Sequence, residues 1–315
     1  MKLDKEEKTD KIKTYPLKER KNKVKVADFA KICEAKRSFK KFVESLPNIL
    51  AGKNFKELVN SIISAQLNGN PIIWAMGAHV IKCGLNPIII NLMKQGFVSG
   101  VALNGAGVIH DVEIALIGAT SEDVAEGLLT GRFGMARETA EIINNAVKEG
   151  VKHNLGFGEA VGRKLIDIKA PFNSYSILAN AVSLKIPVTC HVAIGTDVIH
   201  MHPSADGSAI GKASLTDFKT FSNIICNLVN GGVFLNIGSA VILPEVFLKA
   251  LAIARNLGYD VRNFTTAVFD FNLQYRPSQN VVNRPKILGA KSFYFIGHHE
   301  LLIPLLAQAI LSFKG

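Results

Sequence analysis

Short apolar runs alternate along this chain with longer segments of helical period, and this alternation constrains the fold more than any other feature. The runs hold five to seven residues rich in β-branched side chains. Such a pattern is typical of parallel strands joined by crossover helices. We therefore predict a doubly wound α/β fold with a mostly parallel sheet. The strands are expected at 71–76, 98–103, 187–192, 233–237, 263–268 and 292–296.

Helices are expected between and after these strands. Gly96 is the predicted C-cap of the first helix, and Ser121 is the predicted N-cap of the third. The expected ranges are 86–95, 111–117, 121–129, 134–148, 174–184, 216–229, 245–256 and 300–313.

The first part of the chain differs from the rest in charge. Residues 1–41 hold 15 Lys/Arg against 7 Asp/Glu, so they carry most of the formal net charge of +11. We predict a basic, partly helical N-terminal extension over 1–69, followed by one large domain over 70–315. A basic arm can bind nucleic acid or an acidic partner by releasing counterions. We expect instead that it packs on a neighbouring subunit.

The chain also carries indications of its compartment. Its four cysteines, Cys33, Cys83, Cys190 and Cys226, show no paired spacing that would indicate a disulfide framework or a zinc site. No apolar run reaches the roughly 18 residues that a membrane-spanning helix needs. We therefore expect a cytoplasmic protein that binds no membrane.

Glycine, histidine and aspartate gather where the expected strands end. Seven of the eight histidines lie in these segments. Ligands of open α/β sheets bind beyond the carboxyl ends of the strands, so we expect one site along this edge. The segments are Gly77-Ala78-His79, Asn104-Gly105-Ala106-Gly107 with His110-Asp111, His191 to His202, Gly238-Ser239-Ala240, Phe269-Asp270, and Gly297-His298-His299-Glu300.

Three features of this chain can carry chemistry. Asn104-Gly105-Ala106-Gly107 can hold a cofactor phosphate, although it lacks the full Gly-x-Gly-x-x-Gly spacing. Asp197 lies in a loop with little other charge, where it can hold a cationic amine or cap a turn. Lys286 can act as a nucleophile if it is desolvated beside Arg284, or it can be an ordinary solvated lysine.

The order of these motifs resembles that of the deoxyhypusine synthase family, in which a doubly wound, Rossmann-like domain binds NAD and processes spermidine. The similarity runs from about residue 70 to 309, roughly three quarters of the chain. It is carried by the segments 77–84, 104–111, 196–200, 269–270 and 304–306.

The resemblance implies NAD as cofactor and specific roles for several residues. Asp197 is similar to a catalytic, polyamine-binding aspartate, and Lys286 to the lysine that forms an imine with the aminobutyl group. The implied activity is NAD-dependent aminobutyl transfer from a polyamine such as spermidine to a protein or diamine acceptor, in a homotetramer. The implied cofactor residues are Gly77, Ala78, His79, Cys83, Asn104, Gly105 and Ala106, with Gly238, Thr265 and His298 as further ones.

Other positions depart from the family pattern around the donor amine. Neutral or basic residues, among them Asn280 and Arg284, replace an acidic stretch before the lysine, and Pro244-Glu245 occupies the place that the family gives to a histidine. Each lost charge-assisted hydrogen bond to a polycation costs about 1.5–3 kcal/mol. We therefore expect a rebuilt substrate pocket, in which Asp197, His200 and Glu245 contact the substrate.

Two alternatives come from other classes of protein. The first is a non-catalytic descendant that keeps the fold and NAD and binds RNA or a translation factor through its basic arm. The second is a metal-dependent hydrolase. Its ligands would be drawn from His191, Asp197, His200, His202, His298 and His299.

Overall fold

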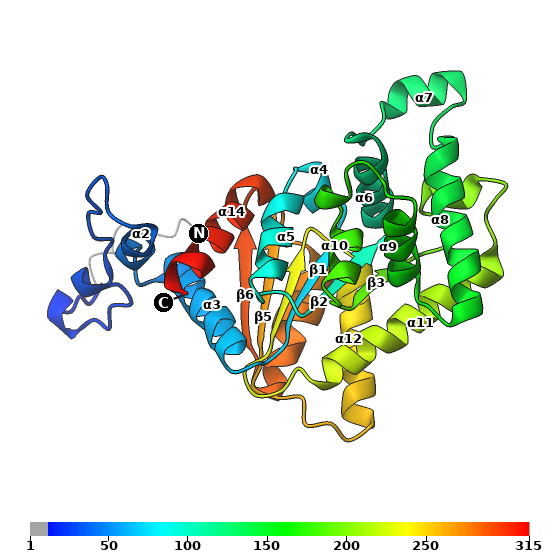
Figure 1. The fold of residues 1–315 in the computed structure, drawn as a ribbon. Coiled ribbons are helices and arrows are strands. Elements are labelled where there is room, and N and C mark those ends of the chain that lie inside the picture. The colour runs from blue at the N-terminus through cyan, green and yellow to red at the C-terminus, as the bar shows by residue number, and fades with distance from the viewer. Residues whose placement is uncertain (1–11, 315) are drawn as a thin grey trace, which may run out of the picture.

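The computed structural model describes residues 12–314, and its centre is a six-stranded sheet (Figure 1). The strand order is β3-β2-β1-β4-β5-β6, and all neighbouring strands run parallel. This confirms the predicted α/β class and the doubly wound parallel sheet. The strands are β1 (Ile72–Met76), β2 (Gly100–Asn104), β3 (Val188–His191), β4 (Val233–Ile237), β5 (Thr265–Asp270) and β6 (Lys291–Ile296).

Helices fill the connections between the strands. The α-helices are α2 (Phe39–Ser45), α3 (Leu50–Leu67), α4 (His79–Lys82), α5 (Asn86–Lys94), α6 (Gly105–Ile117), α7 (Val124–Thr130), α8 (Arg137–Gly150), α9 (Phe157–Asp167), α10 (Ile177–Ser183), α11 (Gly207–Cys226), α12 (Ile242–Asn256), α13 (Tyr275–Pro277) and α14 (His299–Phe313). Shorter turns are η1 (Leu17–Glu19), η2 (Val26–Asp28), η3 (Val151–His153), η4 (Asn173–Tyr175), η5 (Val198–Met201), the π-helical η6 (Ser278–Asn283) and η7 (Arg284–Leu288). Within residues 12–314, no helix is both long and apolar enough to cross a membrane.

Several helix starts differ from the prediction: α11, for example, begins at Gly207 rather than at residue 216. The starts of α6 and α7 bear on the candidate site. Ser121 is not the N-cap of α7, because the Asp123 side chain accepts the hydrogen bond from the backbone N–H of Glu126. Ser121 instead has a left-handed φ of 75° two residues earlier. Helix α6 begins at Gly105 rather than at Asp111, so the helix starts immediately after β2. The predicted glycine loop is thus the first turn of a helix.

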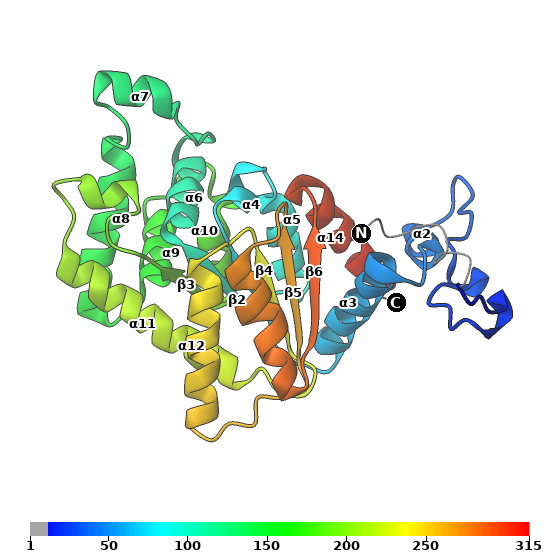
Figure 2. The same ribbon diagram turned by 180° about the vertical axis from the view of Figure 1, so that it is seen from behind.

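Helices cover both faces of the sheet. Successive side chains of a strand point to opposite faces, so each strand contributes to both cores. Trp74 and Met76 belong to a core that includes side chains of α3, α5, α6 and α14. Ile73 and Ala75 belong to a second core with side chains of α11 and α12. Figure 2 shows α11, α12 and the orange segment 275–288 on this second side. The helices on the two faces do not cover the carboxyl edge of the sheet, where the loops lie.

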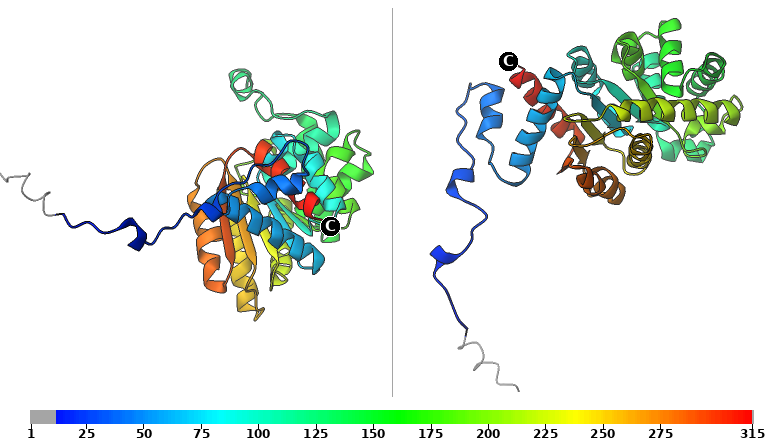
Figure 3. Two further views of the ribbon diagram at one scale, coloured as in Figure 1. Left: turned by 90° about the vertical axis from the view of Figure 1, so that its left-hand side faces the viewer. Right: turned by 90° about the horizontal axis from the view of Figure 1, so that it is seen from below.

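The predicted extension over 1–69 contains two different parts. Phe55, Leu58 and Ile62 of α3 are buried in the larger core, so this helix belongs to the α/β body. Most side chains between residues 12 and 38 are exposed. Figure 3 shows this earlier segment leading away from the body. The basic arm therefore ends before α3.

Two buried carboxylates fix connections of the α/β body. Asp217 on α11 accepts hydrogen bonds from the backbone N–H groups of Gly158 and Cys190, at 2.9 and 2.7 Å. Asp111 on α6 accepts from the N–H groups of Ile177 and Leu178, at 2.7 and 3.0 Å. Burial raises the pKa of Asp217 to about 7 and that of Asp111 to about 6, against the effect of these bonds. Asp111 is thus a structural residue within the predicted strand-end segments.

Candidate functional site

The carboxyl edge of the sheet has a switch point between β1 and β4, from which the two halves of the sheet extend in opposite directions. Gly77 follows β1 and Gly238 follows β4. A Cβ on Gly77 would lie 2.1 Å from the Gly238 carbonyl oxygen, and Gly238 has a φ of 62°. Only glycines allow the two backbones to approach this closely. Switch points of this kind are where doubly wound proteins bind ligands.

Two histidines meet beside this switch point. The Nδ1 atoms of His79, at the start of α4, and His299, at the start of α14, lie 2.9 Å apart. His299 is fully buried, and its Nε2 lies 3.0 Å from the Phe269 carbonyl oxygen. Burial lowers the pKa of His299. The structure therefore pairs His79, a predicted cofactor residue, with His299, which was not among the predicted cofactor residues.

Cys83 and Glu300 surround the histidine pair. The Cys83 Sγ lies 3.4 Å from His79 Nδ1 and 3.6 Å from Glu300 Oε2. Burial, and then the charge of Glu300, raise the pKa of the Cys83 thiol, so it stays protonated at neutral pH. His298, another predicted cofactor residue, is exposed and lies 3.6 Å from Glu300. Cys83 therefore packs beside the pair and is not an activated nucleophile.

Asp197 lies at the N-terminus of α6. Asn104 caps this helix by accepting a hydrogen bond from the Gly107 N–H at 3.0 Å. A Cβ on Gly105 would lie 2.0 Å from Asp197 Oδ2, and the Ala106 N–H lies close enough to this carboxylate to lower its pKa. The first amides of α6, predicted to hold a cofactor phosphate, therefore face a carboxylate of the protein. An ionised Asp197 opposes a phosphate at the same point.

A cavity of about 190 Å³ opens beside Asp197. We call it the acidic pocket, because Glu113, Glu122 and Asp197 line it together with Lys82 and His110. Burial raises the pKa of Asp197 to about 6, although the Ala106 N–H lowers it. Within residues 12–314, the buried Oδ2 of Asp197 has no hydrogen-bond partner. Such a carboxylate is suited to a cationic ligand.

The other two carboxylates of the acidic pocket already hold protein groups. Glu122 accepts from the Gly134 N–H at 2.9 Å. Glu113 accepts from the Thr139 hydroxyl at 3.3 Å and from Thr120. Burial raises the pKa of Glu113, but hydrogen bonds from His110 and Thr120 outweigh it, so the net shift is downward. Glu113 therefore stays ionised and adds negative charge to the pocket.

The remaining predicted histidines do not converge. His200 Nδ1 accepts from the Gly195 N–H at 3.2 Å. His191 Nε2 lies 3.0 Å from the Thr189 hydroxyl, and burial lowers the pKa of His191 to about 3, so its ring is neutral. His202 Nδ1 lies within hydrogen-bond distance of the Ser204 hydroxyl, at 2.8 Å. Across the part of the chain that the structure describes, no group of three His, Cys, Asp or Glu side chains is arranged to hold a metal ion. The geometry gives the metal-hydrolase alternative no support.

Glu245, a predicted substrate residue, lies on the first turn of α12 and faces cations of the protein. Its carboxylate accepts from Arg276 Nε at 3.1 Å and from Asn280 Nδ2 at 3.0 Å, and it also pairs with Lys249. The bond to Lys249, more than the others, lowers the pKa of Glu245. Its charge is thus balanced before any substrate arrives.

Lys286 and Thr265 lie at the opposite, amino end of the sheet. Thr265 is the first residue of β5, and Lys286 precedes β6 in η7, where Asn263 N–H donates to the Leu288 carbonyl at 3.0 Å. A six-residue strand such as β5 spans about 17 Å. Lys286 is exposed, with its Nζ 3.3 Å from Asn283 Oδ1, so the expected desolvation is absent. Within one chain, neither residue joins the others at the carboxyl edge.

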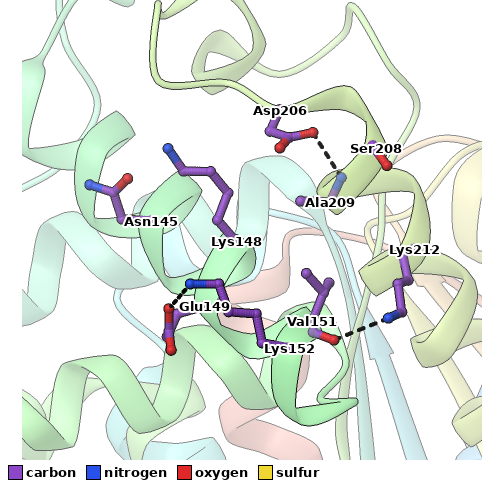
Figure 4. A pocket seen from close by; sticks show the side chains of 9 residues that line it. All are labelled: Asn145, Lys148, Glu149, Val151, Lys152, Asp206, Ser208, Ala209 and Lys212. Carbon is purple, nitrogen blue, oxygen red and sulfur yellow. Dashed lines mark hydrogen bonds and ion pairs between the residues drawn. The ribbon is translucent and has the colours of Figure 1, made fainter.

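A basic hollow lies away from this edge, between α8, η3 and the start of α11 (Figure 4). It has a volume of about 570 Å³. Lys152 pairs with Glu149 at 2.7 Å, Lys212 donates to the Val151 carbonyl at 3.2 Å, and Asp206 accepts from the Ala209 N–H at 3.0 Å. Most of its polar groups satisfy one another, and no predicted site residue lies there.

No protein-family model matches this sequence, and neither does any curated protein. Solved structures nevertheless share the fold. A ternary complex of AgrE with ornithine and NAD+ has 15% identity and a TM-score of 0.53, with 84% of this chain and 34% of AgrE covered. A protein from Methanococcus maripaludis S2 that is described as a conserved LOR/SDH protein has 15% identity and a TM-score of 0.51, with 90% of this chain and 72% of that chain covered.

A protein assigned as a deoxyhypusine synthase from Entamoeba histolytica has 12% identity and a TM-score of 0.52, with 89% of this chain and 95% of that chain covered. At such identities the likeness is one of fold. The chain has the doubly wound fold found in deoxyhypusine synthase-like and LOR/SDH-like structures. It spans only about a third of the length of AgrE.

Proposed function

We propose that this chain is an NAD-dependent enzyme that oxidises a cationic amine at the carboxyl edge of its sheet. The observation that carries the proposal is the acidic pocket. Asp197 lines it, and the buried Asp197 Oδ2 has no hydrogen-bond partner within residues 12–314. The pocket adjoins α4, the helix that leaves the switch point. A cation site beside a dinucleotide position fits amine oxidation.

NAD fits the switch point because Gly77 and Gly238 bring two backbones together where the strand order reverses. Doubly wound proteins bind dinucleotides across this position. Gly77, Ala78, His79 and Gly238 would hold the cofactor there. When bound, NAD supplies the acceptor for two electrons and one hydrogen of the substrate. The fold shared with an NAD+ complex of AgrE supports the same cofactor.

The acidic pocket would bind the ammonium group of the substrate. A cation placed against Asp197 favours the ionised carboxylate, and so offsets the effect of burial on its pKa. Glu113 and Glu122 add negative charge on the other walls. We propose a polyamine such as spermidine as the donor. Its several ammonium groups match a pocket with several carboxylates.

An amino acid with a cationic side chain is a second candidate substrate. Lys82 lines the acidic pocket together with the carboxylates, so the pocket can receive a carboxylate and an ammonium group of one ligand. The volume of about 190 Å³ suits a small molecule. The AgrE complex contains ornithine, a ligand of this kind.

Aminobutyl transfer is the finer part of the proposal. An imine on Lys286 would require this lysine beside the oxidised carbon, whereas Lys286 of the same chain lies at the amino end of the sheet. Transfer would therefore need Lys286 from a second copy, as in a site completed by oligomerisation. Oxidation alone needs no such contribution.

The test is incubation of the full chain with NAD and one of spermidine, putrescine, ornithine or lysine, with the absorbance of reduced nicotinamide as readout. Asp197→Asn should raise KM for the amine on the order of tenfold to a hundredfold, because a charge-assisted bond is lost. Asp260→Asn, at an exposed pair with Arg255, is the matched control. Thermal unfolding of both variants shows whether either substitution changes the stability of the chain.

The oxidation and the transfer can be contradicted separately. The proposed oxidation is contradicted when no amine yields reduced nicotinamide and calorimetry detects no binding of NAD. Borohydride treatment after turnover tests the transfer separately. An adduct on Lys286 would support transfer, and reduced nicotinamide without that adduct would leave oxidation alone.

A further inference from the structure

The hydrogen positions of the histidine pair follow from one fixed acceptor. The Phe269 carbonyl can only accept, so His299 Nε2, at 3.0 Å from it, carries a hydrogen. Burial keeps His299 neutral by lowering its pKa, and its Nδ1 then has a lone pair. His79 must donate to it through Nδ1, at 2.9 Å. In the neutral ring of His79 the remaining nitrogen, Nε2, therefore holds a lone pair.

The surroundings hold the pair in one arrangement. Gly238 leaves room for the His299 ring, because a Cβ there would lie 2.8 Å from its Cε1. The Phe271 ring packs against both imidazoles, with centroids at 5.4 Å from His79 and 5.9 Å from His299. The His79 side chain is only partly buried, whereas His299 is fully buried. The exposed part of His79 is therefore open to a ligand, whereas His299 is not, and the Cys83 Sγ lies 3.6 Å from His79 Nε2.

We infer that His79 Nε2 is the proton acceptor for the amine substrate, and that His299 is a positioning residue that fixes the tautomer of His79. This inference rests on the proposed amine oxidation. Helix α4 carries His79 at its first position and Lys82, on the wall of the acidic pocket, at its last. The short helix α4 thus connects the switch point, at His79, with the cation site, at Lys82.

The proposed step balances as follows for an ammonium substrate. The N–H bond of the ammonium group breaks, and its proton forms a new N–H bond at His79 Nε2. The free amine lone pair then forms the C=N bond as the neighbouring C–H bond breaks and its hydrogen leaves with two electrons. This hydrogen and its two electrons would pass to NAD, the co-reactant of the proposed function. The products are an iminium ion, reduced nicotinamide and protonated His79.

Charged groups lie near both rings of the histidine pair. Cys83 lies beside His79 and Glu300, and His298 Nδ1 lies 3.6 Å from Glu300. The charges of Asp270 and Glu300 oppose the lowering of the His299 pKa by burial. When His79 Nε2 takes the proton, its Nδ1–H keeps the hydrogen bond to the His299 lone pair. Charge–charge repulsion between the two rings opposes a second proton.

The kinetic test compares four variants with NAD and the amine that the wild type oxidises. His79→Gln should lower kcat about a hundredfold or more, the usual contribution of a general base. His299→Phe should lower kcat about tenfold, leave KM nearly unchanged and move the acidic limb of the kcat profile to lower pH. His299→Gln should restore most of kcat, because its amide can donate to Phe269 and accept from His79. His153→Gln, at an exposed histidine on η3, should match the wild type.

A second measurement does not depend on turnover or on the variants folding. Nitrogen-15 NMR of the wild-type chain reports which nitrogens of the two rings carry hydrogen. We expect Nδ1–H for His79 and Nε2–H for His299. The opposite tautomer of His79, or equal pH profiles for wild type and His299→Phe, would overturn the inference while the oxidation stands. Expected tautomers with no turnover would instead remove the proposed function, and the proton-acceptor role with it.

Discussion

Asp217 and Asp111 are acids whose folded-state pKa values lie above the ordinary value of 3.8, at about 7 and about 6. A raised pKa means that the folded state binds a proton more tightly than the unfolded state does. Its contribution to stability is therefore complete below about pH 4 and is lost as the pH rises through the folded-state value. Each carboxylate nevertheless keeps its backbone donors.

We predict that wild type loses stability relative to Asp217→Asn as the pH rises from 4 to 7, by about 1.4 kcal/mol per pH unit. The variant carries no proton at this position that could respond to pH. Urea unfolding at several pH values measures the difference. The comparison with the variant cancels the opposite effect of His191, whose pKa of about 3 adds stability that is lost as the pH falls below about 6.5. A constant difference would contradict the prediction.

Gly238 is a residue at which side-chain space and backbone conformation both exclude alanine. Its φ is 62°, and a Cβ would approach His299 Cε1 to 2.8 Å. Gly258 has a φ of 89°, but a Cβ there would meet nothing within 4 Å. We predict that Gly258→Ala lowers the free energy of unfolding by roughly 1 kcal/mol or more through backbone strain alone. Gly238→Ala should lower it further and disturb the histidine pair, as urea unfolding and NMR would show.

At the scale of elements, helix α9 shows what the sequence pattern hides. Its glycines lower helix propensity, and no helix was predicted over Phe157–Asp167. The structure gives their reason: a Cβ on Gly158 would lie 2.5 Å from the Val188 carbonyl oxygen, and one on Gly162 would lie 2.7 Å from Val182 Cγ2. Close packing on β3 and α10 therefore selects glycine where propensity favours alanine.

Gly162 and Gly211 form a matched pair of helical glycines. A Cβ on Gly211, in α11, meets nothing within 4 Å. We predict that Gly211→Ala raises the free energy of unfolding by up to about 1 kcal/mol through helix propensity. Gly162→Ala should lower it, because the new methyl group collides with α10. Chemical unfolding measures both, and a gain in stability for Gly162→Ala would contradict the packing argument.

The segment that carries Lys286 explains another difference between sequence and structure. The distance of Lys286 from Phe269 along the sequence agrees with the family pattern, but sequence distance does not give direction in space. Here α13, η6 and η7 run back along β5, so Lys286 reaches the amino end of the sheet. The strand-end glycines and histidines were predictable, because each follows an apolar run directly.

For the whole molecule, the alternation of apolar runs and helical segments predicted the layers of the fold. The order of the strands came from the structure, because a crossover can place a strand on either side of its predecessor. The histidine pair could not be predicted for the same reason. His79 and His299 are 220 positions apart, and only the sheet order, in which β4 alone lies between β1 and β5, brings them near each other.

Truncation should separate the two parts of the predicted extension. We expect that removal of residues 1–36 leaves cooperative unfolding with a melting temperature close to that of the full chain, because most side chains between 12 and 36 are exposed. Removal of residues 1–69 deletes α3 and uncovers the larger core, so the product should not fold stably. Circular dichroism during heating distinguishes the two. Stable folding without α3 would contradict its place in the core.

Asp197 gives helix α6 a dependence on what occupies the acidic pocket. Asp197 lines the cavity, and the Ala106 N–H lies close enough to its carboxylate to lower its pKa, so a bound cation and the first turn of α6 act on one anion. An ammonium ligand that holds Asp197 ionised therefore strengthens the helix start. In thermodynamic terms, occupancy of the pocket and opening of the first turn are linked equilibria, and ligand should slow amide hydrogen exchange at Ala106.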